Sequence, residues 1–323
     1  MSIREKLSDI RRALSRFRAL AFSNKLCAFG TLTTIVFLGL ALLYFVSGGA
    51  IAPYNPSRPY PDANAPPSLA HFFGTDFAGR DIFSRVLAAL PVDLSISLMV
   101  VIFSVIIGLL LGMTAGYMGG LVDEAIMRLS DLFLAFPTIV MALMIAATLR
   151  PPSLFNVAVS LTFVWWPSYT RLVRGGVLAI KSEDYIAVSR TLNSSFSYVM
   201  RKGILPNILP SVLVYASLDV GTALISVSSL GFLGVGIPAN TPELGVMVAS
   251  IMQGAAIYLY PWEALIPSVI VLLIVLGFSL FGDGIREAMD VKVRPHIVLR
   301  DRFLGSARLP KREEKEQVNV GTS

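Results

Sequence analysis

The chain has 323 residues, of which 54% are hydrophobic and 15% are charged, and its formal net charge is +6. Soluble domains carry about 25% charged residues, so this composition excludes an ordinary soluble protein and indicates an integral membrane protein. In a membrane protein the placement of positive charge reports orientation, and no nucleic-acid partner is expected. The single cysteine, Cys27, excludes an internal disulfide, and the two histidines, His71 and His296, lie too far apart in sequence to suggest a metal site.

Residues 1–25 carry apolar side chains at helical spacing with arginines between them. This pattern predicts an amphipathic helix that forms a cytoplasmic arm. The arm either lies on the anionic inner leaflet of the membrane or packs on a partner protein. The apolar positions are Ile3, Leu7, Ile10, Leu14 and Phe17.

A transmembrane helix needs about 20 predominantly apolar residues, and six segments of the chain meet this requirement. The first, 26–47, is too long for the apolar part of a signal peptide and lacks a cleavage site, so it is expected to remain as an anchor. A loop over 48–91 follows, and its first stretch, SGGAIAPYNPSRPYPDANAPPS (47–68), is crowded with proline and glycine, which predicts irregular structure there. We therefore expect an all-α integral membrane protein with six transmembrane helices, five of them in a core over 92–285. The apolar segments are 26–46, 94–117, 129–149, 154–173, 208–236 and 262–282.

The lysines and arginines are distributed unequally between the two sides that these spans define. Of the 27, 23 fall on the side of the N-terminus and 4 on the other. Because cytoplasmic segments are enriched in Lys and Arg, both termini are expected in the cytoplasm. Residues 48–91 are then extracytoplasmic, and 286–323 form a cytoplasmic tail. The four outer arginines are Arg58, Arg80, Arg85 and Arg150.

A polar, patterned segment, residues 182–206, separates the fourth and fifth spans. Ser182 can cap a first short helix, and Asn193 suits the left-handed residue that ends it. One of the serines at 194–195 can cap a second helix, which Gly203 would end. The pattern predicts two short cytoplasmic helices joined by an elbow. They form either a connector packed on the protein's own inner surface or a docking surface for a soluble partner.

Asp219 is the clearest charge inside a predicted span. Such residues face a cavity or a partner and mark a transport pathway, so Asp219 is a candidate for lining one. The alternative is a packing role, in which the carboxyl group is hydrogen-bonded locally near the membrane edge.

Three glycine-containing stretches resemble nucleotide-binding loops only superficially. FGTDFAGRD, residues 73–81, is expected outside the membrane as a structural turn in which Asp76 or Asp81 caps the following helix. The glycines of 231–236 suggest close packing or an unwound helix end. The stretch 175–182 lacks the second glycine of a phosphate-binding P-loop, so the energy for any active process must come from another chain.

Several stretches together resemble the C-type permease subunit of dipeptide and oligopeptide ABC importers, over about residues 26 to 295. They are FFGTDFAGRDIFSRVL (72–87), AGYMGGLVDEAIMRLSDLFLAFPT (115–138), WWPSYTRLVRG (165–175) and FGDGIREAMDVKVRP (281–295). The polar segment is similar to the cytoplasmic loop of these permeases in its Leu205-Pro206 pair and in its spacing. Ala187 and Asn193 stand where the family carries Glu and Gly, Gly203 stands at an Ile position, and Val227 stands where relatives carry Glu.

This resemblance implies a permease subunit in the plasma or inner membrane of a prokaryote. It would pair with a second homologous permease, two ATP-binding-cassette ATPase subunits and an extracytoplasmic solute-binding protein. The implied substrates are di- and oligopeptides, with oligosaccharides or a nickel chelate as alternatives. This chain would bind no cofactor, since ATP and Mg belong to the ATPase subunits. The residues implied to contact the ATPases are Asp184, Tyr185, Ala187, Val188, Ser189, Leu192, Asn193, Phe196, Leu205 and Pro206.

Two other functional classes fit the sequence less well. A membrane enzyme would need catalytic groups clustered at one membrane face, and the two scattered histidines argue against such a cluster. A channel would need no docking loop, and it would conduct its substrate without ATP.

Overall fold

A computed structural model describes residues 25–186, 195–251 and 256–289, and nearly all of the regular structure in them is helical. Met1–Arg286 form one compact unit and Glu287–Ser323 a second, and the packing described below lies within the first. The predicted N-terminal arm, apart from its last residue, and residues 290–323 of the predicted tail lie outside the described residues.

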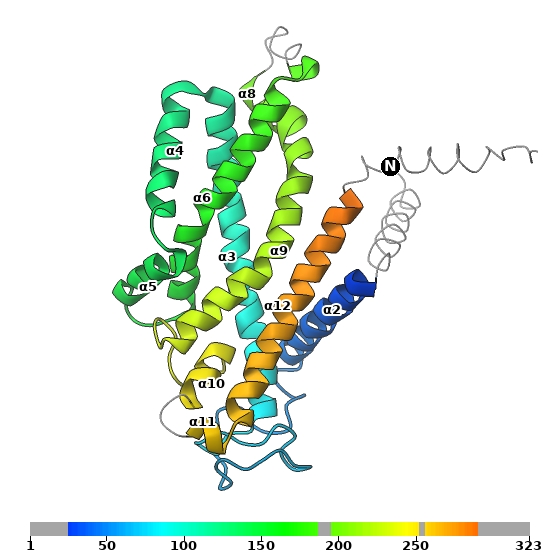
Figure 1. Ribbon diagram of the computed structural model, residues 1–323, viewed down its shortest axis with the longest axis vertical. Coiled ribbons are helices and arrows are strands. Elements are labelled where there is room, and N and C mark those ends of the chain that lie inside the picture. The colour runs from blue at the N-terminus through cyan, green and yellow to red at the C-terminus, as the bar shows by residue number, and fades with distance from the viewer. Residues whose placement is uncertain (1–24, 187–194, 252–255, 290–323) are drawn as a thin grey trace, which may run out of the picture. The chain divides into compact units, whose positions relative to one another are not determined.

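The described helices follow one another without any intervening strand (Figure 1). Four stretches among them are long and apolar enough to cross a membrane: α2, α3, the run from α8 through α9, and α12. The pair of α4 and α5 adds a fifth if it is taken as one bent span. In chain order the helices are α2 (Lys25–Val46), α3 (Ile82–Met118), α4 (Gly120–Leu134), α5 (Thr138–Thr148), α6 (Leu154–Lys181), α8 (Phe196–Tyr198), the π-helical turn η1 (Val199–Ile204), α9 (Leu205–Phe232), α10 (Leu244–Ile251), α11 (Ala256–Leu259) and α12 (Trp262–Met289).

The predicted fourth span lies in α6, which has 28 residues but is too polar to count among these candidates. Its second half contains Arg171, Arg174 and Lys181, and its middle is buried against other helices. Burial within the protein allows such a helix to remain polar at membrane depth, because its polar groups are shielded from lipid.

The predicted third span, 129–149, is not one continuous helix. α4 ends at Leu134, α5 begins at Thr138, and the two helices are bent by 88° relative to each other. Pro137 causes the break because it has no N–H to donate and disfavours helical geometry at the residue before it. Its own backbone is extended, with φ −58° and ψ 124°.

α3 begins at Ile82, so it contains the predicted second span, 94–117, and also the last ten residues of the predicted loop, 48–91. The prediction that Asp81 caps a helix is confirmed, since its Oδ2 accepts a hydrogen bond of 2.8 Å from the backbone N–H of Ser84. Pro91 lies inside the helix without ending it. Tertiary packing can stabilise a membrane helix around a proline.

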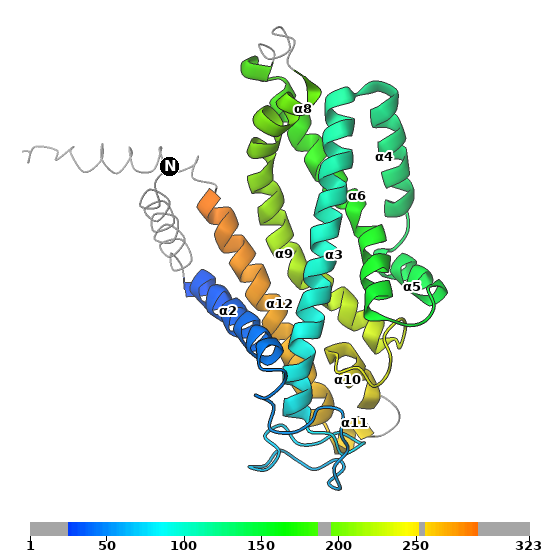
Figure 2. The ribbon, with the colours of Figure 1, turned by 180° about the vertical axis from the view of Figure 1, so that it is seen from behind.

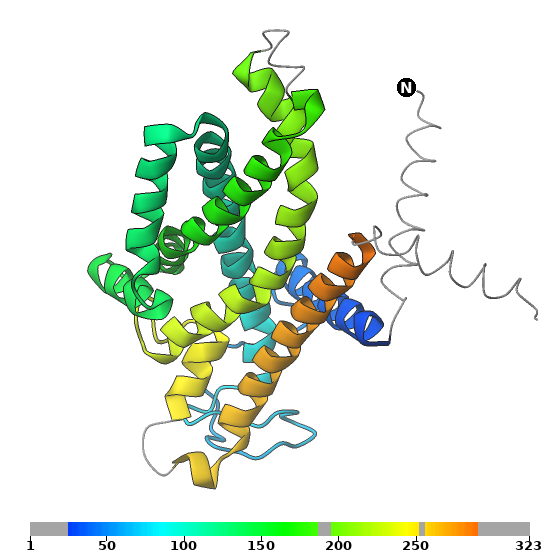
Figure 3. The same cartoon turned by 45° about the horizontal axis from the view of Figure 1, so that its top comes forward.

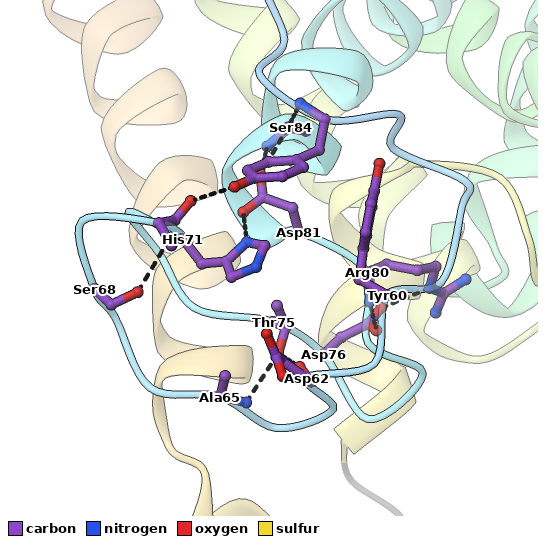
Figure 4. Close-up of polar contacts among 12 residues, drawn as sticks. Tyr60, Asp62, Ala65, Ser68, His71, Thr75, Asp76, Arg80, Asp81 and Ser84 are labelled. Carbon is purple, nitrogen blue, oxygen red and sulfur yellow. Dashed lines mark hydrogen bonds and ion pairs between the residues drawn. The ribbon is translucent and has the colours of Figure 1, made fainter.

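A buried polar network orders the loop that precedes α3 (Figure 4). His71 Nδ1 lies 2.8 Å from Asp81 Oδ1, and the backbone N–H of His71 donates to Ser68 Oγ at 3.1 Å. Arg80 Nε donates to Asp76 Oδ2 at 2.7 Å. Arg85 also lies against this carboxylate, with Nε 3.8 Å from Asp76 Oδ2. Two of the four arginines expected outside the membrane are thus partly neutralised by Asp76.

The polar segment continues directly into the fifth predicted span. The prediction that Ser195 caps a helix is confirmed, because its Oγ accepts a hydrogen bond of 3.3 Å from Tyr198 N. The prediction that Gly203 ends this helix is wrong: α8, η1 and α9 form one continuous run, Phe196–Phe232. The wider π-turn precedes Pro206, which has no N–H to donate to the turn before it. Ser182, predicted to begin a helix, instead forms the C-cap of α6.

The core is formed where α3 crosses α6 and α9, as seen from behind in Figure 2. Gly108, Gly112 and Gly116 lie on the side of α3 that faces α6. A Cβ atom at Gly112 would lie 2.6 Å from Thr170 O, so the two backbones approach more closely than any larger residue would allow. Figure 3 shows α2, in blue, beside α12, in orange, where a Cβ at Gly30 would lie 2.8 Å from Phe281 N.

Candidate functional site

One face of α9 is polar although the helix as a whole is apolar. Tyr215, Asp219, Thr222 and Ser226 follow one another at intervals of four, three and four residues, which places them on the same side of the helix. They line a cavity of about 330 Å³ between α9, α6, and the α4 and α5 pair. The remaining lining residues are Leu134, Thr138, Ile139, Leu161, Val164, Trp165 and Ser168.

Asp219 is bound to α6 by two neutral donors. Its Oδ2 accepts a hydrogen bond of 2.5 Å from Trp165 Nε1 and one of 2.9 Å from the Tyr169 hydroxyl. Tyr169 in turn packs edge-on against Tyr215, with ring centroids 5.2 Å apart. Asp219 is only 8% exposed, and within the described part of the chain no Lys, Arg or His forms an ion pair with it. Asp219 is thus hydrogen-bonded locally, as the packing role predicted, and it also lines a cavity, as the pathway role predicted.

A larger cavity, about 1180 Å³, lies at the C-terminal end of α9. It is lined by the end of α9, the following loop and α10, together with Pro152, and by Phe77 and Arg80 from the loop before α3. Gly234 and Gly236 adopt positive φ angles of 71° and 79°, as expected for an unwound helix end. α9 thus contributes to both cavities, to the smaller one through its polar face and to the larger one through its C-terminal end.

At the opposite end of α9, a small polar network joins Tyr185 of the predicted docking segment to the start of the helix. Asn207 Nδ2 donates to Gly203 O at 2.6 Å and to the Tyr185 hydroxyl at 3.1 Å. Ile186 is buried, while Asp184 and Tyr185 are exposed, Tyr185 by 45%. Two of the predicted docking residues thus lie at the surface beside the first turn of α9.

Phe196 connects this segment to the C-terminal ends of α3 and α6. Its ring packs edge-on against Tyr117, with centroids 5.2 Å apart, and it remains 45% exposed. Lys181 Nζ donates to Tyr117 O at 2.6 Å and lies 5.7 Å from the centre of the Tyr117 ring. Leu205 and Pro206 occupy the first turn of α9. The predicted docking residues outside the described residues are Ala187, Val188, Ser189, Leu192 and Asn193.

Sequence reasoning singled out Asp219 but missed the residues that surround it. Trp165 and Tyr169 are 54 and 50 positions from Asp219, and nothing in their own pattern distinguishes them from core aromatic residues. Thr222 and Ser226 carry a usable signal, because they repeat at helical spacing from Asp219 along one face. In the described ranges, no group of three or more His, Cys, Asp or Glu side chains is arranged to hold a metal ion.

Comparison with known proteins places these features in a family. The model for the binding-protein-dependent transport system inner membrane component matches residues 108–295. The oligopeptide transport system permease protein OppC of Bacillus subtilis (strain 168) is 33% identical over 90% of this chain and 92% of its own. The probable D,D-dipeptide transport system permease protein DdpC of Escherichia coli (strain K12) is 39% identical over 81% and 87%. The glutathione transport system permease protein GsiD of Escherichia coli O157:H7 is 37% identical over 81% and 86%. The chain therefore belongs to the family of binding-protein-dependent transport system inner membrane components, the permease subunits of ABC importers.

Proposed function

We propose that this chain is a permease subunit that imports di- or oligopeptides, driven by ATP hydrolysis on partner subunits. Family membership supports the permease role, and three relatives are named for the transport of oligopeptides, a D,D-dipeptide and glutathione. The observation that carries the proposal is the polar face of α9, which lines a cavity although it belongs to a stretch long and apolar enough to cross a membrane. A polar row in a spanning helix is costly unless it faces water, a partner or a substrate.

The proposed assembly contains a second homologous permease, two ATPase subunits and a solute-binding protein. The sequence has no P-loop, so ATP and Mg would be bound by the ATPase subunits. The solute-binding protein would deliver the peptide on the outer side. Oligosaccharides and a nickel chelate are the alternative cargoes of the same machinery.

We place both termini in the cytoplasm, in a plasma or inner membrane, and count six spans. The charge distribution of 23 to 4 supports this orientation. Four of the six spans would be the four long apolar stretches described above. The other two would be the bent pair of α4 and α5 and the polar helix α6. Two ion pairs, which together make three hydrogen bonds, support this arrangement. Arg174 binds Asp123 through Nε at 2.5 Å and Nη2 at 2.6 Å, and Arg171 Nη2 binds Asp131 at 2.5 Å, which ties α6 to α4.

The proposed coupling between ATP hydrolysis and transport uses the continuous run from α8 to α9. Exposed Tyr185 and Phe196 would contact the ATPase subunits, and closure of the ATPases would push this end of the run. Because α8, η1 and α9 are continuous from Phe196 to Phe232, the motion would reach Asp219 as a rigid-body shift. Lys181 would keep the end of α6 attached to α3 during this motion.

The test is uptake of radiolabelled trialanine into proteoliposomes that contain the whole complex. We expect uptake only when ATP is present on the cytoplasmic side and the peptide-loaded solute-binding protein is present on the outer side. Uptake without ATP would identify a channel. Uptake of an oligosaccharide or a nickel chelate in place of trialanine would keep the importer mechanism and replace the peptide substrate.

A further inference from the structure

The smaller cavity combines one carboxylate with aromatic walls. Asp219, Trp165 and Tyr215 line the cavity together, and Tyr169 donates a hydrogen bond to Asp219 and packs against Tyr215. The polar part of the lining also includes the side-chain hydroxyls of Thr138, Ser168, Thr222 and Ser226. Carboxylates beside aromatic rings are the groups by which proteins recognise ammonium ions, through an ion pair and cation–π attraction.

The hydrogen bonds of Asp219 leave one of its oxygens available. Trp165 and Tyr169 both donate to Oδ2, and no described residue donates to Oδ1. Oδ1 is not among the described side-chain atoms that are fully buried without a partner, so it retains some accessible surface on a residue that lines the cavity. The two donors stabilise the carboxylate, but a buried carboxylate without a cation still carries an unfavourable desolvation free energy. A visiting cation would offset this cost.

We propose that this cavity is a site for the ammonium group of the peptide amino terminus. The inference rests on the proposed function, since it places the site on the proposed pathway. An ion pair between the ammonium group and Asp219 Oδ1 would fix the amino terminus, while Trp165 and Tyr215 flank the charge. A volume of about 330 Å³ fits the first residue or two of a peptide, since ligand pockets begin near this size.

A purely structural role for Asp219 makes a different prediction. In that role its function is to accept two hydrogen bonds, which an asparagine oxygen also accepts. Asp219→Asn therefore keeps the acceptor and removes the charge. Discrimination between charged and uncharged peptides separates the two roles, because only an ammonium site depends on the charge.

Binding is measured first, on the full chain in detergent. The protein has three tryptophans, so the pair of substitutions Trp166→Phe and Trp262→Phe leaves Trp165, the donor to Asp219, as the single fluorophore. We titrate with trialanine and with N-acetyl-trialanine, which lacks the ammonium group. We expect trialanine to bind about tenfold more tightly, as a cation–π contact and an ion pair together predict. In Asp219→Asn the two peptides should bind equally.

The matched control is Glu124→Gln, which removes one negative charge from an exposed, ion-paired position on α4. This variant should keep the preference for trialanine. Equal binding of both peptides to the parent, or an unchanged preference in Asp219→Asn, would overturn the proposal. Thermal unfolding of each variant, followed by circular dichroism, shows whether the binding result reflects a folded protein.

Uptake by the reconstituted complex then separates this inference from the proposed function. We expect Asp219→Asn to lose most of its preference for trialanine over the acetylated peptide, with ATP hydrolysis retained. Equal loss of uptake for both peptides would assign Asp219 a structural role and overturn the site. The chain could prefer trialanine in the binding assay while the parent complex takes up no peptide. That result would contradict the proposed function but support the ammonium site.

Discussion

Glu243 is a fully buried acid at the start of α10. Its two carboxylate oxygens accept hydrogen bonds from Gly245 N at 2.9 Å and Val246 N at 2.7 Å, so it caps the helix. The next residue, Leu244, donates its N–H to Asp93 Oδ2 at 3.2 Å, which attaches α10 to α3. Burial raises the pKa of Glu243 from 4.5 to about 7, even though the two backbone donors act in the opposite direction.

This raised pKa predicts a pH-dependent stability. An acid whose pKa is higher in the folded state binds more protons when folded, so stability is lost as the pH rises from 4.5 through about 7. We expect the parent to be less stable at pH 8 than at pH 5, with Glu243 contributing on the order of 2 kcal/mol. In Glu243→Gln, the part of the stability difference between pH 5 and pH 8 that Glu243 contributes should vanish. Thermal unfolding at both pH values, followed by tryptophan fluorescence, measures it.

The exposed Glu124 provides the control for this prediction, because Glu124→Gln should leave the pH dependence as in the parent. A Glu243→Gln variant with the full pH dependence of the parent would show that Glu243 does not titrate in this range.

At the scale of elements, the crossing of α3 and α6 depends on glycine. A Cβ atom at Gly112 would lie 2.6 Å from Thr170 O and 2.7 Å from Val173 Cβ, whereas one at Gly175, in α6, would meet nothing within 4 Å. The same substitution at the two positions therefore separates helix packing from helix propensity. Both glycines lie inside helices, where alanine is intrinsically favoured.

We expect Gly112→Ala to lower the free energy of unfolding by about 1 to 3 kcal/mol, the usual cost of overpacking a filled contact. Gly175→Ala should be neutral or stabilising by up to about 1 kcal/mol, because alanine is the better helix former. Urea unfolding of both variants in detergent, with circular dichroism as the readout, tests the pair. Equal stability of the two variants would mean that the helices do not cross this closely.

The long apolar runs allowed most of the membrane helices to be predicted, but not their ends. The helix over Lys25–Val46 starts one residue before the predicted segment, since no competing signal interrupts that run. The cap of α3 was one of two that the sequence offered, Asp76 or Asp81, but the loop was extended to residue 91 because the unbroken apolar run begins only near residue 94. The break at Pro137 was overlooked because the flanking residues continue the apolar run.

The site was only partly predictable for a related reason. Asp219 stands out in sequence because a charge in a span is rare. Its partners Trp165 and Tyr169 come from another helix, and no local pattern reports which residues two helices bring together across 50 positions. The docking segment was located by its polarity. Its continuity with α9 depends on the π-turn at Val199–Ile204, which has no simple sequence signal.

At the scale of the whole molecule, the orientation is tested with single cysteines in a Cys27→Ala background. Ser57 and Ser182 are both exposed and lie at opposite ends of the predicted topology. In intact cells, an impermeant thiol reagent should label Ser57→Cys and not Ser182→Cys. After permeabilisation both should react, which controls for shielding by partners. Labelling of position 182 in intact cells would place both termini outside and reverse the topology.

The central claim is that substrate passes along the polar face of α9, and cysteine accessibility tests it most directly. Thr222 and Leu213 are both exposed in the single chain, but Thr222 lines the cavity and Leu213 lies on the opposite side of the helix. In the reconstituted complex, a small charged thiol reagent should modify Thr222→Cys, and trialanine delivered by the solute-binding protein should slow this reaction. Leu213→Cys should stay unmodified. Equal modification at both positions, or no protection of position 222 by the transported peptide, would contradict the account.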